Sequence, residues 1–120
     1  MFEIQTPTYE CLSQGGEMHC VNPEQLLFND LDEEERAKWV KALKPQPAEG
    51  WNGTIRYCGW KDVPSVYLVC EKDQVLPLEI QLQMAGLAGS EVVRCSSGHC
   101  VMLSMPEKVV EVILSAAEGI

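Results

Sequence analysis

The sequence predicts a small α/β fold in which two parallel strands alternate with two helices. Three observations support this prediction. An apolar, β-branched run at residues 65–70 is bounded by Pro64 and a charged turn, as is typical of a buried strand. A second short run of the same kind covers residues 91–95. Between and after these runs, apolar residues recur at the spacing of a helix.

The N-terminal half is expected to be less regular. Residues 1–21 show no hydrophobic period and are expected to form a loose lead-in. Asn22 and Pro23 are typical of a helix cap and a first helical position, so a short helix is expected there. A second helix is expected after Asp32, because acids in the first turn suit the helix dipole. Residues 48–64 are ambiguous, and their large aromatic side chains are expected in the core, with the wall of a pocket as the alternative.

A helix is expected between the two strands, over residues 77–87. Its apolar face is expected to carry Ile80, Met84 and Leu87, which lie at helical spacing. Gln81 falls off this face. Glycines at the end of the segment are typical of a helix stop.

The last helix is expected to begin with a capping box, because Ser104 and Glu107 have the spacing of that motif. An apolar stripe follows: Val109, Val110, Val112, Ile113, Ala116 and Ala117. The chain is therefore expected to divide into a loose lead-in (1–21), a helical segment (22–64) and a C-terminal α/β unit (65–120).

The composition is that of one small globular domain. Of 120 residues, 46% are apolar and 22% are charged, and the net charge is −9. Residues 1–35 hold nine acids and no Lys or Arg, whereas residues 36–120 hold nine of each sign. This acidic balance argues against nucleic acids and against anionic membrane surfaces, both of which bind clustered Lys and Arg.

Targeting and metal signals are not seen in the sequence. No apolar run approaches the roughly 18 residues of a spanning helix, and the first residues do not have the pattern of a secretory signal. A cytoplasmic location is therefore expected, where six cysteines do not form a disulfide framework. Cys95, His99 and Cys100 lack the paired spacing of a zinc site. Neither a metal nor a cofactor is expected.

Two polar residues follow the ends of the predicted strands. Asp73 lies three residues after Cys70, and His99 lies four residues after Cys95. Adjacent parallel strands bring such loops side by side. An aspartate that accepts the ring N–H of a histidine fixes its tautomer and stabilises the imidazolium. Taken singly, Asp73 is more typical of a strand-end turn and His99 of an ordinary loop. Their joint placement, with Pro77 and Pro106 beside them, favours descent from a catalytic pair.

The motifs around this pair resemble the C-terminal third of an α/β-hydrolase. They are Tyr67-Leu-Val-Cys-Glu-Lys-Asp73-Gln-Val-Leu-Pro77 and Ser97-Gly-His99-Cys-Val-Met-Leu-Ser-Met-Pro106-Glu. The stretch from Leu27 to Gln46 is similar to the end of that family's lid. The resemblance covers residues 15–120 and is greatest to the esterase and hydroxynitrile-lyase-like branch, including fungal members.

The resemblance implies a partial α/β-hydrolase fold: a short end of the parallel sheet with flanking helices, and lid-type helices on the N-terminal side. It also implies that Asp73 and His99 are the catalytic acid and base. In this family a serine comes first, in a G-x-S-x-G elbow beside an oxyanion hole. The sequence contains neither motif. Ser13 precedes Asp73, but no strand is predicted before it, so it is not expected to be the nucleophile.

Three functions are consistent with these observations. The first is a truncated relative of the serine hydrolases that act on carboxylic esters, with its nucleophile absent or supplied elsewhere. The second is a non-catalytic binding or accessory protein for a small apolar or ester metabolite, with a surface formed by Trp51, Trp60, Met102 and Met105. The third is an inactive gene fragment. By analogy with fungal relatives, a role in secondary metabolism is also a hypothesis.

The predicted strand at residues 65–70 lacks a neighbour on one side. An exposed apolar edge of this kind offers unpaired backbone groups to another chain. We therefore expect a second copy of the chain, or another protein, to pair at this edge.

Overall fold

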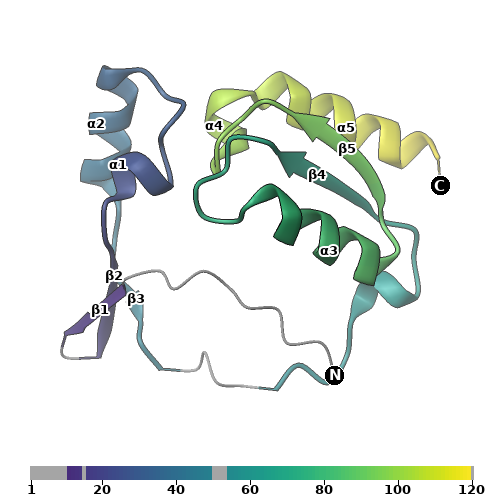
Figure 1. The fold of residues 1–120 in the computed structure, drawn as a ribbon, viewed down its shortest axis with the longest axis horizontal. Coiled ribbons are helices and arrows are strands. Elements are labelled where there is room, and N and C mark those ends of the chain that lie inside the picture. Colours follow the sequence, from purple (N-terminus) through teal and green to yellow (C-terminus); the bar gives the residue numbers. More distant parts are fainter. Residues whose placement is uncertain (1–10, 15, 50–53, 120) are drawn as a thin grey trace.

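The computed structural model describes residues 11–14, 16–49 and 54–119. The elements follow in the order β1 (Cys11–Gln14), β2 (Glu17–Cys20), α1 (Pro23–Leu26), α2 (Glu33–Ala42), β3 (Gln46–Pro47), the 3-10 helix η1 (Gly59–Lys61), β4 (Val66–Cys70), α3 (Leu78–Ala88), β5 (Glu91–Cys95), α4 (Val101–Ser104) and α5 (Pro106–Glu118) (Figure 1). The predicted α/β class is confirmed, and both predicted strands are found within one residue of the expected bounds.

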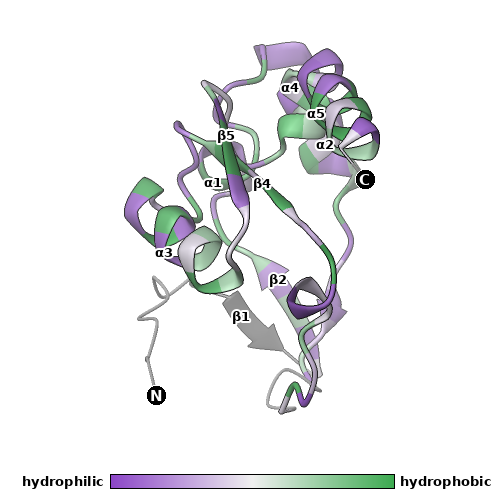
Figure 2. Ribbon diagram, turned by 90° about the vertical axis from the view of Figure 1, so that its right-hand side faces the viewer, coloured by the Kyte–Doolittle hydropathy of each residue, from purple (hydrophilic) through white to green (hydrophobic). Residues whose placement is uncertain are grey.

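β4 and β5 form a two-stranded parallel sheet, with Val66 opposite Glu91 and Cys70 opposite Cys95. Helix α3 packs on one side of the two strands, and α5 lies on the other (Figure 2). Burial is greatest where the strands end, since Val69, Cys70 and Cys95 are all buried. The core of the α/β unit therefore lies directly beneath the loops that follow the strands.

The buried face of α3 differs from the expected one. Gln81 is only 2% exposed, whereas Leu87 is 59% exposed. The Oε1 atom of Gln81 accepts the backbone N–H of Cys70 at 2.9 Å. Its Nε2 donates to the carbonyl oxygens of Cys70 at 2.9 Å and Leu76 at 2.7 Å. The expectation was wrong because Gln81 is buried to satisfy backbone groups.

The N–H and the carbonyl of Cys70 lie on the free edge of β4. The carbonyl of Ser65 and the N–H of Glu71 bond to the β5 side. Because backbone groups alternate between the two edges along a strand, those of Cys70 point away from β5. Gln81 therefore occupies the position that a further strand would take at Cys70. The backbone groups of Val66 and Leu68 point to the same edge, and in the described part of the chain no strand pairs with them.

The N-terminal region is more regular than expected. β1 and β2 form an antiparallel hairpin within the segment predicted to be a loose lead-in, and β3 pairs with β2. These strands are four residues or shorter, which leaves no run long enough to show a period of two. The proposed division of the chain into three parts stays a prediction.

Both predicted helix starts are found in this region. α1 begins at Pro23, although Asn22 adopts a φ of 49° and makes no capping bond with its side chain. α2 begins after Asp32, whose side chain accepts the N–H of Glu35 at 2.9 Å, as a helix cap does.

The aromatic segment is not part of the core, contrary to expectation. Ile55, Tyr57 and Trp60 are exposed, because residues 54–58 form no strand or helix that would turn one side toward the sheet. Trp51 lies outside the described residues.

The capping box was also predicted wrongly. Ser104 ends α4 instead of capping α5, which begins at Pro106 and has no side-chain cap. Part of the apolar stripe on α5 stays exposed, including Val110 and Ile113. Two strands offer too narrow a surface to cover the whole stripe. Among the described helices, none is long and apolar enough to cross a membrane.

Replacing Gln81 tests its role at the strand edge. Gln81→Ala removes the partners of three buried backbone groups, and we expect it to lower the free energy of unfolding by about 3 kcal/mol. Gln83→Ala, on the exposed side of the same helix, is the control and should change it by less than about 0.5 kcal/mol. Urea unfolding followed by circular dichroism measures both. Equal values for the two variants would contradict the assignment.

Candidate active site

Backbone hydrogen bonds continue the sheet beyond the two strands and hold the next residues together. The N–H of Glu71 donates to Cys95 O, and the N–H of Lys72 donates to Ser97 O, both at 2.9 Å. Ser97 is 1% exposed, and its hydroxyl donates to the carbonyl of Gly98 at 2.8 Å. The two loops are therefore joined up to the residues next to Asp73 and His99.

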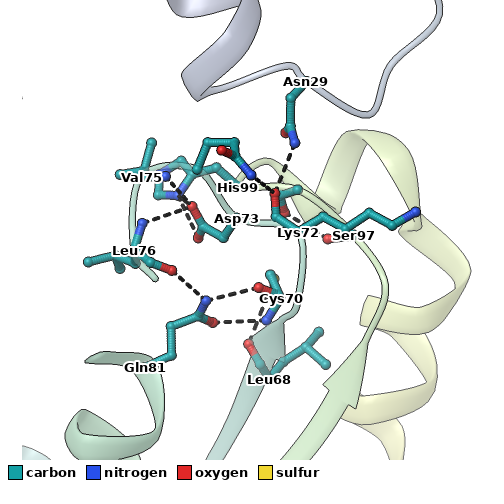
Figure 3. A network of polar contacts seen from close by, with 12 residues as sticks. Asn29, Leu68, Cys70, Lys72, Asp73, Val75, Leu76, Gln81, Ser97 and His99 are labelled. Atoms are coloured by element: carbon teal, nitrogen blue, oxygen red, sulfur yellow. Dashed lines mark hydrogen bonds and ion pairs between the residues drawn. The ribbon is translucent and has the colours of Figure 1, made fainter. Parts of the chain in front are cut away.

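The structure brings Asp73 and His99 into contact (Figure 3). His99 Nδ1 lies 3.0 Å from Asp73 Oδ2 and 3.2 Å from Oδ1. Asp73 Oδ1 also accepts the backbone N–H groups of Val75 at 2.7 Å and Leu76 at 2.9 Å. One carboxylate thus makes both the turn bonds expected of Asp73 and the contact with His99. The catalytic role of the pair stays a prediction.

The surroundings of Asp73 favour its ionised form. Burial raises the pKa of this carboxyl, but the hydrogen bonds from His99, Leu76 and Val75 outweigh burial and hold the pKa below its ordinary value of 3.8. An ionised carboxylate only accepts hydrogen bonds, so the proton of the neutral imidazole lies on Nδ1. Nε2 of His99 then carries a lone pair and can act as a base.

An open concavity of about 310 Å³ lies beside the pair. Asp73 and His99 line it together with Tyr67, Leu76 and Val101, among others. The sequence analysis assigned no site role to these last three residues. For Val101, its place two positions after His99 could have indicated one. Neither Trp60 nor the methionines Met102 and Met105 line this concavity. Their binding role stays a prediction.

Nearby thiols are poor candidates for a nucleophile. Burial raises the pKa of Cys70, which lines the concavity, to about 11. Burial, and then the charges of Asp30 and Asp73, raise the pKa of Cys100. Since the thiolate is the reactive form, both sulfurs are weak nucleophiles at neutral pH. Among the residues that the structure describes, no three His, Cys, Asp or Glu side chains gather as metal ligands.

A buried carboxylate in contact with a histidine at the ends of adjacent parallel strands agrees with comparison to known families. The family model described as the alpha/beta hydrolase family matches residues 6–112. The chain belongs to the alpha/beta hydrolase family. The resemblance noted from the two motifs is confirmed, and so is the partial α/β-hydrolase fold, as short sheets with flanking helices.

Two fungal relatives agree with this assignment. An alpha/beta hydrolase of Aspergillus novofumigatus is 38% identical over 122 residues, which cover 96% of this chain and 48% of that protein. A probable hydrolase of a Phoma species is 40% identical over 65 residues, which cover 49% of this chain and 27% of that protein. The chain thus spans about half, or less, of the length of these relatives.

The pKa of Asp73 predicts how stability depends on pH. Because the folded-state pKa of Asp73 is lowered, its ionised carboxylate stabilises the fold at pH values above the ordinary pKa of 3.8. This contribution is lost as the pH falls through the folded-state pKa. Asp73→Asn should therefore be less stable than the unmodified chain at about pH 7, and the difference should shrink toward about pH 3.

Urea unfolding at several pH values measures this difference. Asp62→Asn, which removes an exposed carboxylate, is the control and should differ little from the unmodified chain at any of these pH values. A difference for Asp73→Asn that stays constant as the pH falls would contradict the prediction.

Proposed function

We propose that this chain supplies the acid and the base of a carboxylic-ester hydrolase. One observation carries the proposal: Nδ1 of His99 lies 3.0 Å from a carboxylate whose pKa is lowered, at the edge of an open concavity. This arrangement leaves Nε2 of His99 able to accept a proton from a group outside the pair. His99 is the proposed general base, and Asp73 orients it and stabilises the imidazolium.

In the proposed reaction, Nε2 of His99 takes the proton of a nucleophilic hydroxyl as its oxygen attacks the ester carbonyl. The imidazolium then returns this proton to the leaving alcohol, and water releases the acyl group by the same steps. Family order places the nucleophile in a G-x-S-x-G elbow, which the sequence lacks. The proposal therefore assigns the nucleophile and the oxyanion hole to a polypeptide segment outside these 120 residues.

The edge of β4 is the proposed place for that segment. β4 pairs with β5 on one side only within the described residues, and the backbone of Val66 and Leu68 faces the other side. A strand from a partner chain, or from a second copy, would complete the hydrogen bonds there. Exposed apolar residues on α5, such as Val110 and Ile113, support a larger assembly in which they are covered.

A second candidate is a binding protein without catalysis. It is favoured by the absence, in the part of the chain that the structure describes, of any hydroxyl hydrogen-bonded to Nε2 of His99. In this case the concavity beside Tyr67 and Leu76 would hold a small apolar or ester metabolite. Such a protein would bind an ester without turning it over. A place in secondary metabolism is part of either proposal.

Turnover of p-nitrophenyl acetate separates these functions. The purified chain alone should show no hydrolysis that depends on His99, because removing the nucleophile of a triad leaves only background catalysis. When the chain is co-expressed with the remaining half of the Aspergillus novofumigatus relative, hydrolysis should appear, and His99→Ala should reduce it by about 100-fold or more.

His19→Ala is the matched control, because His19 is the other histidine of the chain and lies in β2, away from the pair. It should retain the restored activity. Restored turnover that is equal in the His99→Ala and unmodified chains would overturn the proposed base. Turnover by the chain alone that is lost in His99→Ala would show that its nucleophile lies within these residues.

A further inference from the structure

The segment between α1 and α2 is hydrogen-bonded to both loops that carry the acid and the base. Asn29 Nδ2 donates to the carbonyl of Lys72 at 2.9 Å, across 43 positions of sequence. The backbone N–H of Gly98 donates to Asp30 Oδ2 at 2.6 Å, across 68 positions. Lys72 immediately precedes Asp73, and Gly98 immediately precedes His99. Two neighbouring side chains thus bond to the residue before each member of the pair.

Asn29 and Asp30 are themselves held in place. Arg36, in the first turns of α2, donates to the carbonyl oxygens of Phe28 at 3.1 Å, Asn29 at 3.4 Å and Leu31 at 2.7 Å. Phe28 is buried at 3% exposure. Figure 1 shows α1 and α2 beside the loops that follow β4 and β5. The segment is therefore fixed on one side by α2 before it meets the loops.

The contact with Gly98 is close. A Cβ atom at position 98 would overlap Asn29 Oδ1 and would lie 2.8 Å from Asp30 Oδ1. Both oxygens are buried, and neither has a hydrogen-bond partner in the described part of the chain. Burying an oxygen without a partner costs free energy. The contact therefore contributes less to stability than a contact with every polar atom hydrogen-bonded would. Its closeness nevertheless restrains the backbone beside His99.

We propose that Asn29 and Asp30 are positioning residues that hold the Asp73 loop and the His99 loop at contact distance. Asn29 restrains the acid loop through Lys72, and Asp30 restrains the base loop through Gly98. Neither side chain touches the reacting atoms. The use of this restraint in catalysis rests on the proposed ester hydrolysis, but the restraint itself acts on the pair in this chain. It can therefore be measured without turnover.

The Nδ1–H proton of His99 gives a direct measurement, because its exchange with water is slow only while it is hydrogen-bonded to Asp73. Proton NMR of the purified chain should show this slowly exchanging resonance, assigned by its loss in His99→Ala. Asp30→Ala should speed its exchange by about tenfold or more, the factor that corresponds to losing a hydrogen bond to a charged group. Asn29→Ala should speed it by a smaller factor, because the bond to the carbonyl of Lys72 joins two neutral groups.

Two matched variants distinguish positioning from a general effect of charge. Asp30→Asn keeps an oxygen that accepts the N–H of Gly98 and should retain slow exchange. Glu33→Gln removes an exposed charge three residues away, in the first turn of α2, and should also retain it. Backbone amide signals of Val69 and Val93, whose N–H groups face the partner strand, report in each variant whether β4 and β5 remain paired.

An unchanged exchange rate in Asp30→Ala, with the amide signals of β4 and β5 intact, would overturn the proposal. If Asp30→Ala unfolds the sheet, Gly98→Ala decides instead, because it keeps both polar side chains but its Cβ displaces Asn29. The proposal then requires faster exchange in Gly98→Ala, and unchanged exchange overturns it. Failure of the ester assay would leave these NMR outcomes as they are, so the two proposals can fail separately.

Discussion

The in-register parallel pairing of β4 with β5 is the constraint on which the rest of the structure depends. Cys70 lies opposite Cys95, and backbone bonds continue this register for two residues beyond the strands. The two loops therefore begin at opposite positions on neighbouring strands, at the same end of the sheet. A shift of one residue would turn each side chain of a strand to the opposite face and would separate Asp73 from His99. Burial is greatest at this end of the sheet, so packing and site geometry stabilise the same register.

Asp73 links the local folding of its loop to the charge of the site. Its carboxylate accepts two backbone N–H groups of the following turn and also contacts the ring of His99. Burial alone would favour the neutral acid, but the hydrogen bonds outweigh this effect. The bonds that shape the turn are thus among those that keep the carboxylate ionised. A side chain that satisfied only the turn, such as asparagine, would keep the shape and lose the charge.

The sequence was sufficient to predict what depends on local patterns. Both strands of the parallel pair are apolar runs with clear boundaries, and the positions of Asp73 and His99 follow from where those runs end. Gln81 was missed because hydrophobic periodicity does not register the backbone groups of a strand edge that require a partner. Asn29 and Asp30 were missed because their partners lie 43 and 68 positions away, and no local pattern reports such a contact.

The glutamine on the free edge of β4 also limits how another strand can add there. Gln81 already occupies the donor and the acceptor of Cys70, so an incoming strand could pair only at Val66 and Leu68, where the carbonyl of Leu68 accepts a long bond from the Cys70 thiol at 3.9 Å. It can align along the first part of β4 but cannot extend its pairing past Cys70. The amide of one side chain therefore acts as a stop for strand addition: an added strand would border the concavity at Val66 and Leu68 and would end before it reaches Asp73.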